Sequence, residues 1–419
     1  MSAAARTLPR DLPQVEGQDR SAVHQFPSPV QALRPALDLV QTFDGFEALE
    51  AEWTALFERA GTDRHLFQTF NWLWHWANHF LPRDGDSGNV RLAIVTARDA
   101  GRLVMIWPLV AERSGPVTEL AWMGEPVSQY GDLLIVDGPD ALALMREAWA
   151  FVTRETGADV LRLRKVRQDS KVAPFLAELG ATVTSDLKAP YLNLASAPSF
   201  AEYEKRYSSG AKRNRKRQRR RLEDRGPVAL NWVESGAEAE ALTAHAFHLK
   251  HIWLRQRGIV SPALADPRTA RFFADVTRAD IRPAGCHVLA LNCNDQPVAL
   301  EIGLRCLGRT AIHIIAYDPD FEKTAAGSLL MEDSIRRACD DGLKVFDLLA
   351  PGDGYKLEWA DDAVAVRDWA KPVTLLGRAY VTLYLGLIRN GSKRVIGALP
   401  LGARRVVTEM LTRWTQPKG

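Results

Sequence analysis

The order of predicted elements is the feature that most constrains the fold, because it occurs twice along the chain. Each half begins with helices, continues through a meander of strands, and closes with a helix and a further strand. In the first half, apolar spacing predicts helices over 46–59 and 67–80, hairpin strands over 90–97 and 102–112, and a closing helix over 140–157 that ends at a glycine.

The second half repeats this alternation from residue 195 onward. Its predicted helices cover 199–209, 211–225, 237–258, 266–280 and 325–342, and its predicted strands cover 228–234, 286–293, 297–305, 309–317 and 344–349. The repeated order predicts an α/β (α+β) protein of two tandem domains, each with a mixed, mostly antiparallel sheet flanked by helices. We expect domains at 36–195 and 196–376, after a disordered lead-in at 1–35.

The composition favours a cytoplasmic location and argues against a zinc site or a disulfide framework. The chain has 419 residues, of which 46% are hydrophobic, enough for real cores. Its four cysteines form no CxxC pair, so neither a zinc site nor a disulfide framework is predicted, and a cytoplasmic location is the default. The lead-in lacks the apolar core of a signal peptide, and no run of 18 uncharged apolar residues predicts a membrane span.

The segment 212–221 holds eight Lys or Arg residues in ten positions. Removing these eight cations from the formal net charge of +3 leaves −5 for the rest of the chain, so the basicity is local. The cations surround the predicted helix and leave no apolar stripe before Leu222, which predicts a solvated, poorly buried helix. We therefore expect nucleic acid not to be the main partner of this chain.

The tail, 377–419, alternates apolar residues with Arg and Lys at roughly helical spacing and is interrupted at Pro400. This pattern predicts a basic amphipathic helix. Two interpretations remain open: a helix packed on the protein body, or peripheral contact with a membrane surface.

The start of the predicted helix 325–342 is a candidate phosphate site. Ala325, Ala326, Gly327 and Ser328 have small side chains, so a ligand can approach the unpaired backbone N–H groups of the first turn. The alternative is an ordinary helix start whose small residues permit close packing.

Polar residues gather in 346–362, just beyond a predicted strand. Asp347 follows Phe346, and Lys356 follows Tyr355, in a Gly-Pro loop at the kind of strand end where binding residues are common. The alternative is a structural turn in which Asp347 pairs with Lys356.

Two polar residues interrupt apolar strands. If the hairpin loop has three residues, 306–308, Arg305 faces Arg309, and Glu301 lies opposite His313. A carboxylate beside an imidazole inside a sheet is a possible general base, although the same pair can be a satisfied polar contact in the core. A loop of another length would separate them.

No nucleophile elbow, P-loop, dinucleotide-binding glycine motif or HExxH sequence is present. The sequence therefore lacks the motifs typical of hydrolases, NTPases, dehydrogenases and metalloproteases. What remains resembles a known family. The stretches "FQTFNWLWHW", "KRNRKRQRRRLEDRG", "QPVALEIGLR", "AYDPDFEKTAAGSLL" and "FDLLAPGDGYKLEW" are similar to the CelD/BcsL-like acyltransferases of the GNAT superfamily, which are linked to cellulose and exopolysaccharide biosynthesis.

This resemblance implies tandem GNAT folds related to the FemAB aminoacyl ligases. It implies acyl transfer from acetyl-CoA or another acyl-CoA, as a co-substrate and not a permanent cofactor, to an amine or hydroxyl of a saccharide-type acceptor. The family's pyrophosphate loop corresponds here to Lys323, Ala326, Gly327, Ser328 and Leu329, where Ala326 and Ser328 replace glycines.

The chemistry requires a base, donors for the oxyanion, and an acid for the leaving thiolate. We expect Glu301 or Asp347 to be the base, with His313 as its partner, Tyr355 as the acid, and Lys356 orienting the acceptor. Two alternatives remain: a FemAB-like transferase that uses aminoacyl-tRNA, and a non-catalytic assembly factor of a polysaccharide system.

Overall fold

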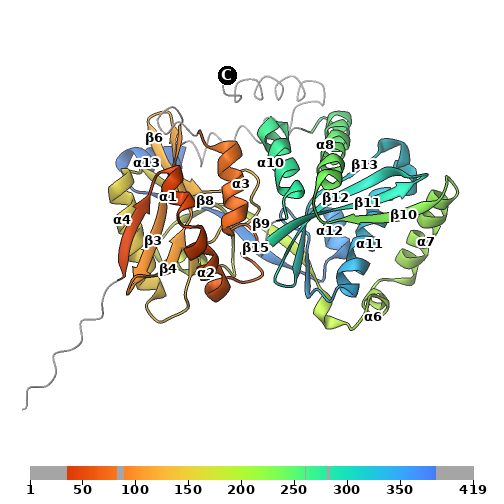
Figure 1. The fold of residues 1–419 in the computed structure, drawn as a ribbon, viewed down its shortest axis with the longest axis horizontal. Coiled ribbons are helices and arrows are strands. Elements are labelled where there is room, and N and C mark those ends of the chain that lie inside the picture. Colours follow the sequence, from red (N-terminus) through yellow and green to blue (C-terminus); the bar gives the residue numbers. More distant parts are fainter. Residues whose placement is uncertain (1–34, 83–88, 260, 281–283, 384–419) are drawn as a thin grey trace, which may run out of the picture. The chain divides into compact units, whose positions relative to one another are not determined.

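The computed structural model describes residues 35–82, 89–259, 261–280 and 284–383. Most of the predicted lead-in, and the predicted tail from residue 384, lie outside the described residues. The strands form two sheets (Figure 1). A four-stranded sheet has the order β1-β3-β4-β7, and an eleven-stranded sheet has the order β10-β11-β12-β13-β14-β9-β15-β8-β6-β5-β2.

The strands of the first half are β1 (Ala36–Val40), β2 (Val90–Leu92), β3 (Ile94–Asp99), β4 (Arg102–Trp107), β5 (Leu109–Ser114), β6 (Val117–Trp122), β7 (Leu134–Ile135), β8 (Val160–Arg167) and β9 (Thr182–Asn193). The strands of the second half are β10 (Val228–Val233), β11 (Ala284–Cys293), β12 (Gln296–Cys306), β13 (Arg309–Tyr317), β14 (Val345–Asp347) and β15 (Asp362–Pro372).

The α-helices are α1 (Phe43–Glu47), α2 (Glu50–Ala60), α3 (Phe70–Phe80), α4 (Ala141–Thr156), α5 (Val172–Glu178), α6 (Phe200–Tyr203), α7 (Ser209–Glu223), α8 (Ala237–Arg257), α9 (Pro262–Ala265), α10 (Pro267–Arg278), α11 (Ala326–Asp340), α12 (Gly354–Trp359) and α13 (Leu375–Ala379). Short 3₁₀ turns cover Leu194–Ser196, Glu204–Arg206 and Pro319–Thr324.

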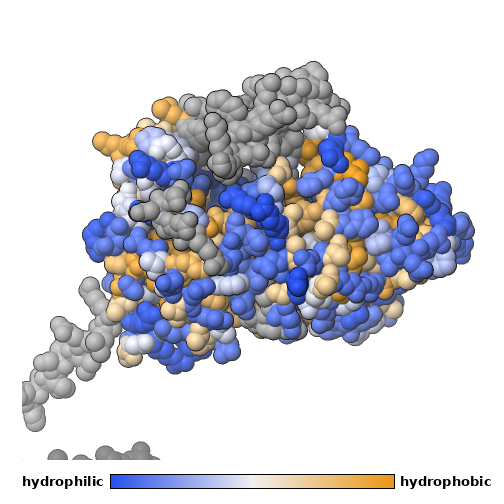
Figure 2. All heavy atoms as spheres, turned by 45° about the horizontal axis from the view of Figure 1, so that its top comes forward, coloured by the Kyte–Doolittle hydropathy of each residue, from blue (hydrophilic) through white to orange (hydrophobic). Residues whose placement is uncertain are grey.

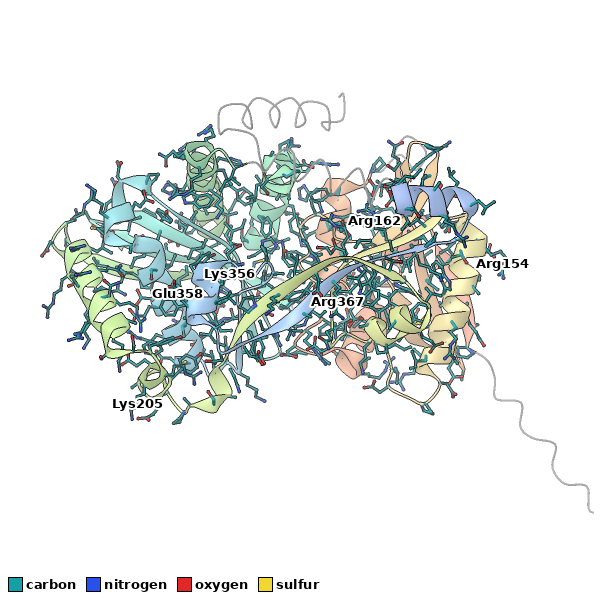
Figure 3. The ribbon with its side chains drawn as sticks, turned by 180° about the vertical axis from the view of Figure 1, so that it is seen from behind. Arg154, Arg162, Lys205, Lys356, Glu358 and Arg367 are labelled. Carbon is teal, nitrogen blue, oxygen red and sulfur yellow. The ribbon has the colours of Figure 1, made fainter. Side chains whose placement is uncertain are left out.

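The two halves exchange their last strands. In each half, the final strand of the meander runs parallel to the strand after the long helix: β6 beside β8, and β13 beside β14. The next neighbour comes from the other half, because β8 pairs with β15 and β14 pairs with β9. The strands β9 and β15 also pair with each other and run through the middle of the molecule (Figure 3).

The predicted fold class of two tandem GNAT-like units is confirmed by this repeated strand order. The division near residue 195 falls inside one continuous sheet, and we retain it as a proposal for the limit between the repeats. The predicted hairpin is present as β3 and β4, and α4 ends at Gly157 in the left-handed conformation. The strands β1 and β15 were not predicted from the sequence, and the predicted helix 46–59 is divided into α1 and α2.

An aromatic core joins the halves on one face of the large sheet. Trp72 of α3 packs edge-to-face on Phe272 of α10, with 4.8 Å between ring centroids. Both side chains are fully buried, and they belong to one apolar cluster that also contains residues of β11, β12 and β13. The helix α11 covers the opposite face of the second half, where it contacts β11, β12 and β13.

The basic helix α7 is not a fully solvated helix, which corrects the prediction from its charge pattern. Arg215 is buried, donates to Glu332 Oε1 at 2.8 Å, and lies over the rings of Tyr207 and Trp359. Arg219 donates to Asp333 of α11 at 2.7 Å. Cations can therefore form the buried face of a helix when carboxylates and aromatic rings receive them.

The surface is mostly hydrophilic in the view of Figure 2, with hydrophobic residues protruding at its upper left. Among the exposed apolar residues, Leu375 at the start of α13 is 83% exposed. Within the described residues, no helix has the length and apolar character that crossing a membrane would require.

The buried face of α7 gives a prediction for stability. Replacing Arg215→Ala leaves Glu332 without its partner, and we expect the free energy of unfolding to fall by about 3 kcal/mol. The matched control is Arg213→Ala on the exposed face of the same helix, which should change it by less than about 0.5 kcal/mol. Urea unfolding followed by circular dichroism measures the free energy of unfolding of each variant. Equal losses in the two variants would contradict the claim that Arg215 holds α7 on the protein.

Candidate active site

A cavity of about 490 Å³ opens beside the free edge of β13 in the second half. It lies between α8, the first turn of α11, and α12. Its lining residues are Lys250, Trp253, Ile315, Ala316, Tyr317, Glu322, Ala325, Ala326, Gly327, Ser328, Met331, Asp353, Tyr355, Glu358 and Trp359. Figure 3 shows Glu358 with its neighbour Lys356 on α12.

The strand β13 has an open edge because its neighbour is short. The parallel pairing with β14 covers only Arg309 to Ala311, opposite Val345 to Asp347. From Ile312 to Tyr317, β13 is paired on its β12 side alone, and Lys250 Nζ donates to the carbonyl oxygen of Ile315 at 3.0 Å. The two strands thus form a wedge that is closed at Ala311 and open toward α11.

The first turn of α11 lies at the wide end of this wedge. Its N-cap, Ala325, has φ 56° and provides no capping side chain, so N–H groups of the first turn are left for another acceptor. A Cβ at Gly327 would lie 3.1 Å from Cδ1 of Tyr317, which shows how closely strand and helix approach there. Such a helix end favours an anion.

Three of the five residues predicted to bind the cofactor line the cavity: Ala326, Gly327 and Ser328. The other two do not. Leu329 is buried in the core between α11 and the sheet, and Lys323 is exposed in the 3₁₀ turn before the helix. That these residues bind the donor stays a prediction.

Asp347, predicted as a possible base, is enclosed by four donors. Oδ1 accepts from the Tyr130 hydroxyl at 2.8 Å and from the backbone N–H of Leu349 at 2.9 Å. Oδ2 accepts from Arg309 Nη1 at 2.8 Å and from Arg167 Nη1 at 3.3 Å. The carboxylate is fully buried, so it has the surroundings of a structural anchor. Burial, followed by the Asp347 charge, raises the pKa of the Tyr130 phenol.

These contacts extend into a chain of ion pairs, which we call the Asp347 network. Its members are Asp63, Arg64, Tyr130, Arg167, Asp169, Arg309 and Asp347. Arg309 also bonds Asp63 at 3.0 Å, Arg167 bonds Asp169 at 2.9 Å, and Arg64 bonds Asp169 at 3.1 Å. The network joins the first half to β13 and β14 at the closed end of the wedge.

The predicted pairing of Glu301 with His313 is wrong. The hairpin turn has two residues, Leu307 and Gly308, both with positive φ, and Cys306 lies opposite Arg309. This register places Arg305 opposite Thr310. A bulge at His313 then shifts the pairing, and Glu301 lies opposite Ile315.

Glu301 faces α11 instead. It is fully buried, its Oε1 accepts from the Ser334 hydroxyl at 2.8 Å, and the nearest imidazole is that of His287 at 3.9 Å. Burial raises the pKa of the Glu301 carboxyl to about 8, against a smaller lowering by Ser334. Neither this carboxyl nor the imidazole of His313 is among the residues that line the cavity.

His313, in the bulge, contacts both halves. Its Nε2 lies 2.6 Å from the carbonyl oxygen of Val127, a distance that requires Nε2 to carry the proton. Nδ1 therefore has the lone pair, and it is buried with no hydrogen-bond partner among the described residues. Burial lowers the pKa of His313 to about 4, with a contribution from Lys165, so the ring is neutral at physiological pH.

The two predicted residues of α12 have different settings. Tyr355 lines the cavity, and desolvation, followed by Asp353, raises the pKa of its phenol to about 12. Lys356 Nζ instead donates to the carbonyl oxygens of Leu349 and Pro351, at 3.1 and 3.0 Å, and supports the preceding loop.

The sequence analysis missed the cavity residues of α8. Lys250 lies at the open edge of β13, and burial, followed by Lys356, lowers its pKa. Trp253 donates to the Tyr317 hydroxyl at 3.1 Å. Nothing in the helical pattern of 237–258 distinguishes these side chains from its other polar residues. No cluster of three or more metal-ligating side chains was found among the described residues.

Residues 209–357 match the family described as acetyltransferase (GNAT) domain. A search of curated proteins gave no match. Among solved structures, FemX is similar with a TM-score of 0.55 and 8% identity, over 80% of this chain and 98% of that one.

Two further structures share lower similarity. A tandem GNAT protein from the clavulanic acid pathway has a TM-score of 0.46 and 14% identity, over 80% of this chain and 98% of that one. The C-terminal domain of a putative lysylphosphatidylglycerol synthetase from Agrobacterium fabrum has a TM-score of 0.48 and 10% identity, over 80% and 97%.

The matched domain contains β13, the first turn of α11 and most of α12, which are the elements around the cavity. The protein is an acyltransferase of the GNAT type, and acyl-CoA is the co-substrate that this domain implies.

The raised pKa of Glu301 gives a prediction on pH dependence. Between pH 4.5 and 8 the folded protein keeps a proton that the unfolded chain releases, so this group's stabilising contribution is present below pH 4.5 and is lost as the pH rises to 8. Glu301→Gln should therefore gain stability relative to wild type between pH 5 and pH 8, by at least about 1.4 kcal/mol.

Urea unfolding at the two pH values measures this difference. Glu58→Gln, on the exposed face of α2, is the control and should show no such gain. A difference between Glu301→Gln and wild type that is independent of pH would contradict the account.

Proposed function

We propose that the cavity binds the thioester donor, acetyl-CoA or another acyl-CoA, along the open edge of β13. The observation that carries this proposal is the open edge of β13, which has the uncapped first turn of α11 at its wide end and the bulged residue His313 two residues from its closed end at Ala311. The donor pyrophosphate binds the N–H groups of Ala326 and Gly327, and the thioester reaches Ile312 and His313.

The length of the open edge supports this orientation. Six residues, Ile312 to Tyr317, extend about 20 Å at the rise of a strand. A strand edge that is not paired with another strand binds an extended ligand that carries amides, as the pantetheine arm of CoA does. The cavity beside this edge is lined by Ile315, Met331 and Trp359, which offer the arm an apolar wall.

His313 replaces Glu301 and Asp347 as the base in this proposal. The acceptor nitrogen attacks the thioester carbonyl carbon, the C–N bond forms, and the nitrogen becomes positively charged and acidic. Nδ1 of His313 takes its proton, since Nε2 is already committed to Val127. A neutral ring is ready for this step because its pKa is lowered to about 4.

Collapse of the tetrahedral intermediate breaks the C–S bond and releases the CoA thiolate. Tyr355 is the proposed proton donor to that sulfur, because it lines the cavity and its pKa of about 12 keeps the phenol protonated. Lys356 supports the loop that places α12, a role that replaces its predicted contact with the acceptor.

The finer parts of the proposal concern the acceptor and the cellular setting. The resemblance to CelD/BcsL-like acyltransferases supports an amine or hydroxyl of a saccharide or its precursor as acceptor, in cellulose or exopolysaccharide biosynthesis. It supports action in the cytoplasm, with membrane contact through the basic tail. The likeness to FemX, at 8% identity, concerns the fold alone.

The proposal predicts a selective loss of turnover in His313→Gln. Glutamine can still donate to the Val127 carbonyl but lacks a base at the position of Nδ1. We expect kcat to fall by about 10²- to 10⁴-fold with little change in acetyl-CoA affinity. Release of free CoA thiol measures turnover, and stabilisation of the protein by acetyl-CoA against heat measures binding.

Glu301→Gln is the matched control, because it changes the other predicted base and should leave turnover nearly unchanged. Wild-type turnover in His313→Gln would exclude His313 as the base. Absence of any heat stabilisation by acetyl-CoA in the wild-type protein would reject the donor site itself.

A further inference from the structure

Lys165 occupies an unusual backbone position beside the proposed reaction centre. It lies in β8 with φ 55°, a left-handed conformation that non-glycine residues rarely adopt in a strand. Asp368 of β15 accepts its backbone N–H at 2.9 Å, and its carbonyl oxygen accepts from Gly131 at 3.1 Å. Strained positions that the surroundings hold in this way concentrate at functional sites.

This conformation directs the Lys165 side chain toward His313. Nζ donates to the carbonyl oxygen of Ser128 and to Oε1 of Gln129, both at 3.0 Å. The amide nitrogen of the same Gln129 lies 3.4 Å from Nε2 of His313. One amide group therefore separates the ammonium from the imidazole, and one ammonium N–H is left for another acceptor.

The ammonium groups around His313 have carbonyl acceptors but no carboxylate partner. Within the described residues, no acidic side chain forms an ion pair with Lys165, Lys250 or Lys356. Two carboxylates act on Lys165 without forming an ion pair with it: Glu125, whose Oε2 bonds Arg164 at 2.8 Å, and Asp368, which accepts from the Lys165 backbone.

The pKa values of these lysines and of His313 depend on burial and on the neighbouring charges. Asp353 raises the pKa values of Lys356 and Lys250, and Asp347 also raises that of Lys356, but burial lowers both values by more. Burial lowers the pKa of Lys165 to about 8, and Lys165 and Lys356 both contribute to the lowered pKa of His313. Glu125 and Asp368 offset the lowering at Lys165 only in part. An incompletely balanced positive charge in a partly buried place favours an anionic ligand.

We infer that Lys165 binds a compact oxyanion, a carboxylate or a phosphate, which the acyl acceptor carries close to its nucleophilic nitrogen or oxygen. The donor phosphates do not account for this site, since they belong at the first turn of α11, at the other end of the open edge. That this ligand is the acyl acceptor rests on the proposed function. If so, the acceptor is an amine or alcohol that also carries an acidic group.

Competitive acetylation of the whole protein tests the anion site. Acetic anhydride reacts with neutral amines only, and a bound anion stabilises the ammonium form of Lys165. At pH 8, with CoA at saturation, inorganic phosphate or propionate should slow acetylation of Lys165 about fivefold, because a rise of one unit from a pKa of about 8 lowers the neutral fraction at this pH by that factor. Mass spectrometry of the digest measures each lysine separately.

Two controls separate this effect from general screening. Sodium chloride at the same ionic strength replaces the anion, and Lys371 of β15, which donates to the Leu179 carbonyl at 2.6 Å, is the reference lysine. Protection by phosphate alone identifies a phosphorylated acceptor, and protection by propionate alone identifies a carboxylate. No protection beyond that by chloride would overturn the inference.

Further results distinguish a failure of the anion site at Lys165 from a failure of the proposed function. Protection that is present without CoA and absent at saturating CoA would place the anion in the donor site and overturn the acceptor assignment. Phosphate or propionate should also compete with the acceptor and slow turnover of the wild-type protein. Lys165→Met should lose this inhibition while keeping the stabilisation by acetyl-CoA against heat. A wild-type protein that acetyl-CoA does not stabilise rejects the donor site, whatever Lys165 does.

Discussion

The buried carboxylate of Asp347 is the constraint on which the active-site geometry depends. Two guanidinium groups, a phenol and a backbone N–H converge on it, and it lies in the short stretch where β13 and β14 are still paired. Breaking such a buried pair is costly, so the network fixes the closed end of the wedge. Beyond the Asp347 network the two strands separate, which leaves the edge of β13 open from Ile312 onward.

In both halves the last strand of the meander runs parallel to the strand after the long helix, but the halves differ at this position. In the first half, β6 and β8 also pair over only two residues, Glu119 and Leu120. There, however, the segment after β6 packs tightly, because a Cβ at Gly131 would lie 2.1 Å from Nε1 of the buried Trp122. The family match covers the second half only. The first half instead contributes Tyr130, Arg167 and Val127 to the site of the second.

The local part of the fold could be predicted from the sequence, and the long-range part could not. The hairpin of β3 and β4, the end of α4 at Gly157, and the helix start at Ala326 follow from turn residues and apolar spacing. The strand β15 was missed because its partners, β8 and β9, are far away in the sequence. The His313 bulge was missed because a shift of one residue leaves no trace in an apolar strand.

Amide hydrogen exchange tests the central claim, that the donor lies along the open edge of β13. Bound acetyl-CoA should slow exchange in peptides that cover Ile312–Tyr317 and the first turn of α11, because the arm bonds the strand and the phosphates bond the helix. Peptides of β6, Val117–Trp122, should not change. Exchange that is unaltered along β13, or slowed at β6 instead, would contradict the account.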